Sequence, residues 1–261
     1  GDGQGDVPAA EYTDVVLGAA DPGPWGLATG DFDGDGLRDV AVALGSQWNG
    51  LGQPNRKVNV FLNDGNRKFV HSVTLQASGT FPIDCSTGDF DGDGSVDLAV
   101  VCNTAGVNVF PGSGDGTFGP MRVLSTQQNC LRCYTVDLDS DGHLDLVTTS
   151  SGLFPFQYVY WNDGTGWASG PAQGVGLNPG YGFAYGDLDQ DGHLDILASA
   201  PATFPTYTAG LRVRLGPATP PVAAGPGAGP APSAGSWSSG GPPSTGRGAH
   251  AQPSCQRTEP Q

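Results

Sequence analysis

Four stretches of the sequence place aspartates at every second position. The first, DFDGDGLRD, runs from Asp31 to Asp39, and the others begin at Asp89, Asp137 and Asp187. Carboxylates held a few ångströms apart repel one another and raise one another's pKa. A cation placed among them removes that repulsion, so the pattern is typical of a metal site.

These stretches offer only hard oxygen donors, which select Ca²⁺ or Mg²⁺ over zinc and copper. Many carboxylates in a flexible loop favour Ca²⁺. We therefore expect about four structural calcium ions, one for each loop, held by side chains and by the backbone carbonyl of the seventh loop residue. The predicted ligands are Asp31, Asp33, Asp35, Leu37 and Asp39; Asp89, Asp91, Asp93, Ser95 and Asp97; Asp137, Asp139, Asp141, His143 and Asp145; and Asp187, Asp189, Asp191, His193 and Asp195.

Two other interpretations of the loops are an EF-hand and a metal-free turn. An EF-hand begins in the same way but needs a bidentate Glu at loop position 12 and flanking helices. That position holds Val42, Val100, Thr148 and Ala198 here, which argues against an EF-hand. Metal-free Asx turns are the simpler alternative, because Asp and Gly favour turns by themselves. The loops hold 16 of the 26 acidic residues, and this concentration favours metal binding.

The elements that must position these loops are short strands. The loops start 58, 48 and 50 residues apart, which is the period of a repeat array. Alternating apolar runs such as DVAVAL leave each loop, and others such as VNVFLNDG enter Asp-Gly turns. We therefore predict an all-β fold: a β-propeller-like array of four-stranded antiparallel blades with calcium-binding loops. About four repeats are present, as a partial or open propeller.

The motifs resemble the FG-GAP and VCBS repeats, the β-propeller blades of integrin α subunits and many secreted bacterial proteins. The resemblance covers about Tyr12 to Leu215, and TFGP at Thr117 to Pro120 approaches the Phe-Gly element of that family. It implies a secreted or cell-surface protein. Propellers of that family usually have more blades than the four units found here, so closure would need more chain, a partner copy or another fold.

The composition divides the chain into two regions. Residues 1–215 carry the repeats, whereas Gly, Pro, Ala and Ser make up 33 of the 46 residues in 216–261. Such a segment cannot bury enough apolar surface to offset its ordering entropy, so we expect a disordered tail. A linker or stalk, an excerpt boundary and a shifted reading frame all remain open for this tail.

Charge and motifs exclude several functional classes. The net charge is −15 with only 11 Lys and Arg and no basic patch, which argues against a nucleic-acid partner. A run of about 18 apolar residues is absent, so we expect no membrane span in this chain. Signatures of a serine hydrolase, a P-loop or a dinucleotide site are also absent, and we expect no enzymatic activity. Asp21 and Asp84 remain open as a carboxylate pair.

Four of the five cysteines lie within the repeats. Cys85 and Cys133 each stand four residues before a loop, where we expect a small inward-facing side chain. Cys85 could bridge to Cys102 if the strand register permits. Cys130 and Cys133 could form a tight disulfide, remain free or provide half of a zinc site; without a second half, zinc is disfavoured.

Ligand binding is expected on the connections opposite the acidic loops, because their lengths vary and the resembling integrin propeller binds its ligand on that side. The exposed-aromatic candidates are Trp48, Phe154, Phe156 and Tyr181, although capping of blade ends is the simpler role for each. The predicted function is a calcium-binding extracellular adhesion or ligand-binding module for protein or glycan. The alternative is an accessory propeller of a secreted polysaccharide-degrading enzyme, with further blades or another domain outside this chain.

Overall fold

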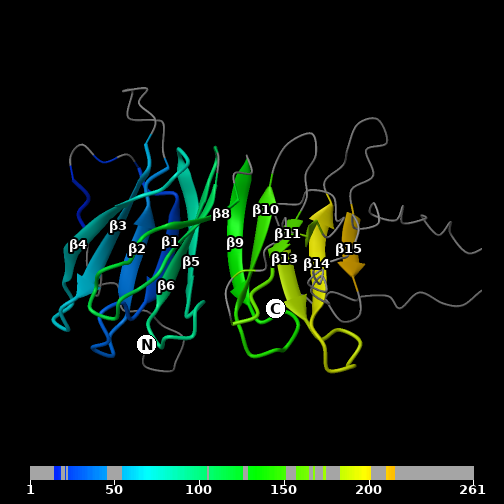
Figure 1. Cartoon of the computed structure of the whole chain (residues 1–261). Helices are drawn as coiled ribbons and strands as arrows, with labels where there is room; N and C mark the ends of the chain where they lie inside the picture. Colours follow the sequence, from blue (N-terminus) through cyan, green and yellow to red (C-terminus); the bar gives the residue numbers. More distant parts are fainter. Residues whose placement is uncertain are drawn as a thin grey trace, which may run out of the picture. The chain divides into compact units, whose positions relative to one another are not determined.

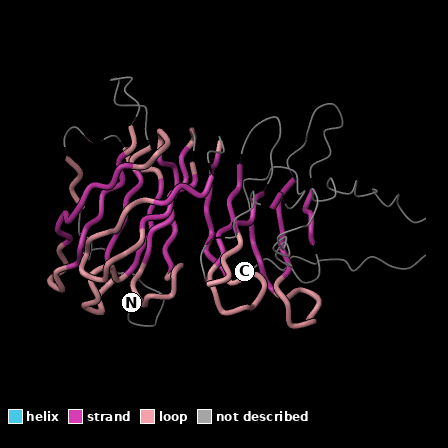
Figure 2. Tube along the Cα trace, viewed as in Figure 1, coloured by secondary structure: helices cyan, strands magenta, loops and turns pink. Residues whose placement is uncertain are grey.

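The computed structural model consists of short strands joined by turns. It describes residues 15–18, 21, 23–45, 55–104, 106–125, 129–150, 157–164, 167, 173–174, 183–200 and 210–214. Within these ranges the regular structure is strand only (Figure 2). No helix in this part of the chain is long and apolar enough to cross a membrane.

The strands form four antiparallel sheets, each built from consecutive strands (Figure 1). The first sheet contains β1 (Gly26–Gly30), β2 (Asp39–Ala43), β3 (Lys57–Asn63) and β4 (Phe69–Gln76). The second contains β5 (Pro82–Gly88), β6 (Asp97–Cys102), β7 (Val107–Phe110) and β8 (Arg122–Ser125). The third contains β9 (Cys130–Val136), β10 (Asp145–Ser150), β11 (Gln157–Tyr160) and β12 (Gln173–Gly174). The fourth contains β13 (Phe183–Gly186), β14 (Asp195–Ala200) and β15 (Gly210–Arg214).

This architecture confirms the all-β array of antiparallel blade-like sheets predicted from the repeats. Three of the sheets have the expected four strands, while the fourth has three strands within the described residues. The domain division at residues 215 and 216 stays a prediction, because that boundary and the tail lie outside the described residues.

The core lies between consecutive sheets. Ala28 and Val58 of the first sheet pack with Val100 of the second in one buried cluster. Equivalent clusters join the second sheet to the third and the third to the fourth. Because alternate residues of a strand face opposite sides, the central strand β6 is buried on both faces, between two neighbouring sheets. The array is open within the described residues, because no further sheet follows the fourth in that part of the chain.

The outer face of the first sheet is partly covered by chain that precedes it. Val15 and Leu17 pack against the buried side chains of Val42, Leu44 and Phe61. The segment is fixed by the Asp21 carboxylate, which accepts hydrogen bonds from Lys57 Nζ (2.9 Å) and Asn59 Nδ2 (3.0 Å).

The strand register decides the cysteine question. Cys85 pairs with Val100 and Cys102 pairs with Pro82, so the two thiols are offset along the hairpin. Cys85, Cys102, Cys130 and Cys133 are all free and buried. The bridge between Cys85 and Cys102 that the sequence left open is therefore absent, and the inward position of Cys85 and Cys133 is confirmed.

Candidate metal centre

Each acidic stretch forms the connection between the first two strands of its sheet. We number them acidic loop 1 (residues 31–39), loop 2 (89–97), loop 3 (137–145) and loop 4 (187–195). In every loop, carboxylate oxygens from the first, third and ninth residues lie within 4.8 Å of one another. The groups are Asp31, Asp33 and Asp39; Asp89, Asp91 and Asp97; Asp137, Asp139 and Asp145; and Asp187, Asp189 and Asp195.

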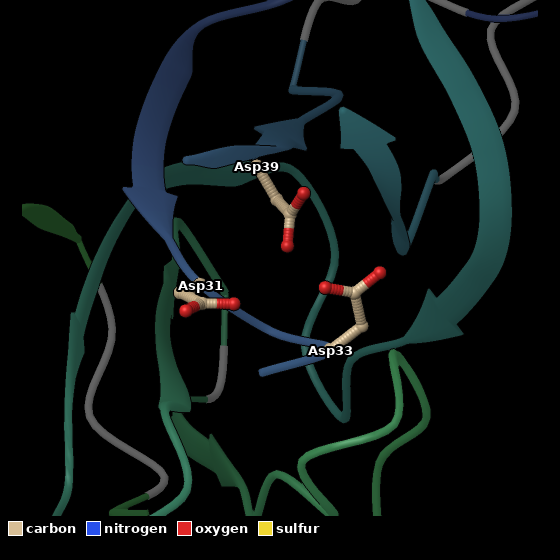
Figure 3. Close-up of side chains that lie close together, drawn as sticks. All are labelled: Asp31, Asp33 and Asp39. Carbon is tan, nitrogen blue, oxygen red and sulfur yellow. The ribbon is translucent and has the colours of Figure 1, made fainter. Parts of the chain in front are cut away.

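Loop 1 illustrates the arrangement. Asp31 and Asp33 lie in the loop that follows β1, and Asp39 is the first residue of β2 (Figure 3). The three carboxylates point toward a shared space rather than away from one another (Figure 3). Carboxylates would turn outward if repulsion alone governed their positions, so backbone contacts must hold them.

The first aspartate is held by the turn itself. In loop 2 the Asp89 carboxylate accepts the N–H of Gly92 at Oδ1 (2.7 Å) and that of Gly94 at Oδ2 (3.0 Å). The turn needs positive φ at its fourth and sixth residues, which are 73° at Gly92 and 88° at Gly94. Loops 3 and 4 keep positive φ at the fourth residue with Ser140 (62°) and Gln190 (65°). The turn therefore imposes this backbone conformation even where the residue is not glycine.

The ninth aspartate joins the loop to the body of the sheet. Asp97 is 1% exposed and accepts N–H bonds from Phe90 (2.8 Å) and Gly112 (2.7 Å). Burial raises its pKa to about 6, and the nearby Asp91 and Asp93 carboxylates add to the rise. Burial likewise raises the pKa of Asp145 to about 7. The protein thus holds a carboxylate where its charge is unfavourable without a cation.

The fifth residue of each loop lies outside the group of three carboxylates. Its Oδ1 instead accepts the N–H two residues ahead, at distances from 2.7 to 2.9 Å. These residues are Asp35, Asp93, Asp141 and Asp191. Their role as ligands, and that of the carbonyls of Leu37, Ser95, His143 and His193, stays a prediction.

Two oxygen atoms indicate what the loops can hold. Oδ1 of Asp91 and Oδ1 of Asp139 are shielded from solvent and have no hydrogen-bond partner in the described structure. A shielded acceptor without a donor is costly unless something else satisfies it. Carboxylate oxygens of this type, in groups of three, are suitable ligands for a hard divalent cation such as Ca²⁺. The residues present therefore suit the metal predicted from the sequence.

Comparison with known families agrees with this geometry. The family model of the FG-GAP-like repeat matches residues 31–100 and 89–148. Residues 31–148 are FG-GAP-like repeats. Each FG-GAP-like match begins at the first aspartate of an acidic loop, and together the matches span loops 1 to 3. This confirms the resemblance drawn from the motifs. A comparison with curated proteins found no match.

The remaining candidates divide into two groups. The aromatic residues Trp48, Phe154, Phe156 and Tyr181 lie outside the described residues, so their role stays a prediction. Asp21 and Asp84 each hold a structural contact, and their role as a carboxylate pair stays a prediction. Asp84 accepts the N–H of Cys133 (3.2 Å), which joins the second sheet to the third.

Sequence reasoning missed the residues that connect one loop to the next. Asn162, in the hairpin that follows β11, donates from Nδ2 to the carbonyl oxygen of Phe90 in loop 2 (2.7 Å). The N–H of Gly116 donates to the carbonyl oxygen of Phe32 in loop 1 (2.9 Å). The recurring Asp-Gly turn was visible in the sequence, but its contact with the preceding repeat was not.

Proposed function

We propose that the chain is a calcium-stabilised, extracellular β-propeller-like module that binds a protein or carbohydrate ligand and has no catalytic activity of its own. The observation that carries the calcium assignment is the same three-carboxylate group in four loops, with solvent-shielded oxygens of Asp91 and Asp139 left without donors. FG-GAP-like repeats are a module type associated with extracellular interaction, which supports the second part of the proposal.

The role of the cation is structural. A bound Ca²⁺ supplies positive charge that offsets the repulsion among the carboxylates. The chain's own residues do the rest: the ninth aspartate holds the start of the second strand, and its N–H donors hold the loop and the hairpin. Metal binding and the folding of each sheet are therefore linked.

Thermal unfolding with and without calcium tests this assignment. The full chain is melted in excess Ca²⁺ and after chelation, and bound calcium is counted on the same sample. We expect about four ions per chain, one for each acidic loop, and a lower melting temperature after chelation. An unchanged melt with no bound calcium would leave the loops as plain Asx turns and would refute the proposal.

Ligand binding needs a separate test. The calcium-loaded chain is applied to a glycan array and to a panel of extracellular matrix proteins, and we expect saturable binding. Mutations in the acidic loops should weaken this binding more than mutations in the outermost strands of the sheets. Depolymerisation of an acidic polysaccharide by the chain would instead favour the enzyme-associated alternative.

A further inference from the structure

The hairpin after the third strand of a sheet rests on that sheet's own acidic loop. In the third sheet, Asn162 N–H donates to Oδ1 of Asp145, the ninth residue of loop 3 (2.9 Å). In the first sheet, Asn63 N–H donates to Oδ1 of Asp39 in the same way (2.8 Å). Both asparagines also donate from Nδ2 to the carbonyl oxygen of the residue before that aspartate, at 3.1 Å and 3.2 Å.

Asn162 makes one bond that Asn63 does not make. Its Nδ2 also donates to the carbonyl oxygen of Phe90, the second residue of loop 2 (2.7 Å). The contact is dry, because Asn162 is 3% exposed and Phe90 is 3% exposed. Trp167, from the same hairpin, packs on the Phe90 ring with centroids 5.3 Å apart. The third sheet therefore forms part of the wall of loop 2.

These bonds connect the two buried aspartates of neighbouring loops. Asp97 accepts the N–H of Phe90, the Phe90 carbonyl accepts Asn162 Nδ2, and the Asn162 N–H donates to Asp145. A cation that fixes Asp145 also fixes the position of Asn162. Asn162 in turn fixes the peptide of Phe90, whose N–H holds Asp97 in the carboxylate group of loop 2.

We propose that Asn162 couples acidic loops 2 and 3, so that cation binding in one loop raises the affinity of the other. The proposal rests on the proposed calcium binding and concerns how two sites communicate. Asn162 acts here as a positioning residue, since it lies outside the carboxylate groups. Coupling of this kind is reciprocal, so each loop should strengthen the other by the same factor.

Asn63 provides a matched control. Its Oδ1 accepts the N–H of Gly65 (3.1 Å), just as Oδ1 of Asn162 accepts that of Gly164 (3.3 Å). It belongs to the first sheet, which no acidic loop precedes in the described chain. Replacing Asn63 removes the same bonds within the hairpin but no bond to another loop.

The test measures calcium affinity by calorimetry in the full chain with loops 1 and 4 disabled by Asp33→Asn and Asp189→Asn. The dissociation constant of loop 2 is measured with loop 3 active and with loop 3 disabled by Asp139→Asn. We expect disabling loop 3 to weaken loop 2 at least about 5-fold. The coupling factor is the ratio of the loop 2 dissociation constants measured with loop 3 disabled and with loop 3 active. In the Asn162→Ala protein this factor should fall to about 1, and in the Asn63→Ala protein it should stay as in the parent.

Charge repulsion between the two sites is the same in all three backgrounds, so the change in the factor isolates the Asn162 contact. An equal factor in the Asn162→Ala and Asn63→Ala proteins would overturn the proposal, and so would a parent without coupling. If Asn162→Ala does not fold, Asn162→Ser serves in its place with Asn63→Ser as its control, because serine adds no charge, can still accept the N–H two residues ahead, and is too short to reach the Phe90 carbonyl oxygen. Absence of any calcium binding in the unmodified chain would refute the proposed function itself, which is a different result.

Discussion

Acidic loops 2 and 4 share one sequence pattern but have different surroundings. Both hold their first aspartate with N–H bonds from the turn and bury their ninth aspartate. The second residue of loop 2, Phe90, is 3% exposed, whereas its equivalent in loop 4, Leu188, is 49% exposed. The difference is the third sheet, which covers loop 2 and has no described counterpart beyond loop 4. The turn is therefore local, while its apolar cover comes from the next repeat.

Glycines at the ends of β5 and β13 repeat the contrast. A Cβ atom on Gly88 would lie 2.7 Å from Leu144 Cδ1 of acidic loop 3. A Cβ atom on Gly186, at the equivalent position of the fourth sheet, would meet no atom within 4 Å. Close packing between sheets thus requires glycine at one position and leaves it optional at the other.

The largest expected effect separates the two apolar loop residues. Phe90→Ala removes a buried ring from the core between the second and third sheets, and should lower the free energy of unfolding by about 3–5 kcal/mol. Leu188→Ala removes a half-exposed side chain and should cost less than about 1 kcal/mol. Urea unfolding in excess calcium measures both. Equal losses would mean that Leu188 is covered in solution.

A smaller effect is expected from the two glycines. Gly88→Ala forces Leu144 to move and should destabilise the protein by about 1–3 kcal/mol. Gly186→Ala should be neutral or should stabilise by about 0.4–1 kcal/mol, because alanine restricts the unfolded chain. The measurement is the urea midpoint of each variant. A clear loss with Gly186→Ala would show that another surface packs there and would remove the contrast.

The smallest effect concerns pH in calcium-free protein. The cover over loop 2 desolvates Asp97 and raises its folded pKa to about 6, well above the value of about 3.9 for an unfolded chain. A raised carboxyl pKa means that the folded state prefers the protonated form. Stability from this group is therefore fully present below about pH 4 and is lost as pH rises through about 6.

Melting temperatures in chelator at pH 5 and pH 7 test this sign. Asp97→Asn should reduce the fall in melting temperature between these pH values by a few degrees, which corresponds to about 1.3 kcal/mol of stability. Asp115→Asn is the control, because hydrogen bonds from Thr117 lower the pKa of Asp115, so that this group stays ionised from pH 5 to pH 7. If Asp97→Asn leaves the pH dependence unchanged, the pH dependence does not come from Asp97.

The sequence was sufficient for the features that each repeat builds by itself. The strands on both sides of the loops followed from alternating apolar residues, and the glycines at positions such as Gly34 and Gly36 correctly indicated positive φ. The metal-binding loops could be proposed because four copies of one pattern are far more informative than one. Three of the four predicted carboxylates in each loop lie together.

The contacts between repeats could not be predicted. Nothing in the letters Asn-Asp-Gly distinguishes Asn162, which bonds the preceding loop, from Asn63, which does not. The burial of Asp97 and Asp145 likewise depends on neighbouring strands and hairpins rather than on the loop sequence. Whether Cys85 and Cys102 could form a disulfide depended on the actual strand register, because a shift of one residue moves a side chain to the other face of the sheet.

The bond from Asn162 to Phe90 also sets an order of events during synthesis. The ribosome adds about 5–20 residues per second, and Asn162 lies 72 residues beyond Phe90. Loop 2 must therefore wait roughly 4–14 s for the residue that completes its wall, at that rate of elongation. Over that interval the nascent chain carries an unfinished acidic loop, and the repeats mature one behind the other from the amino terminus.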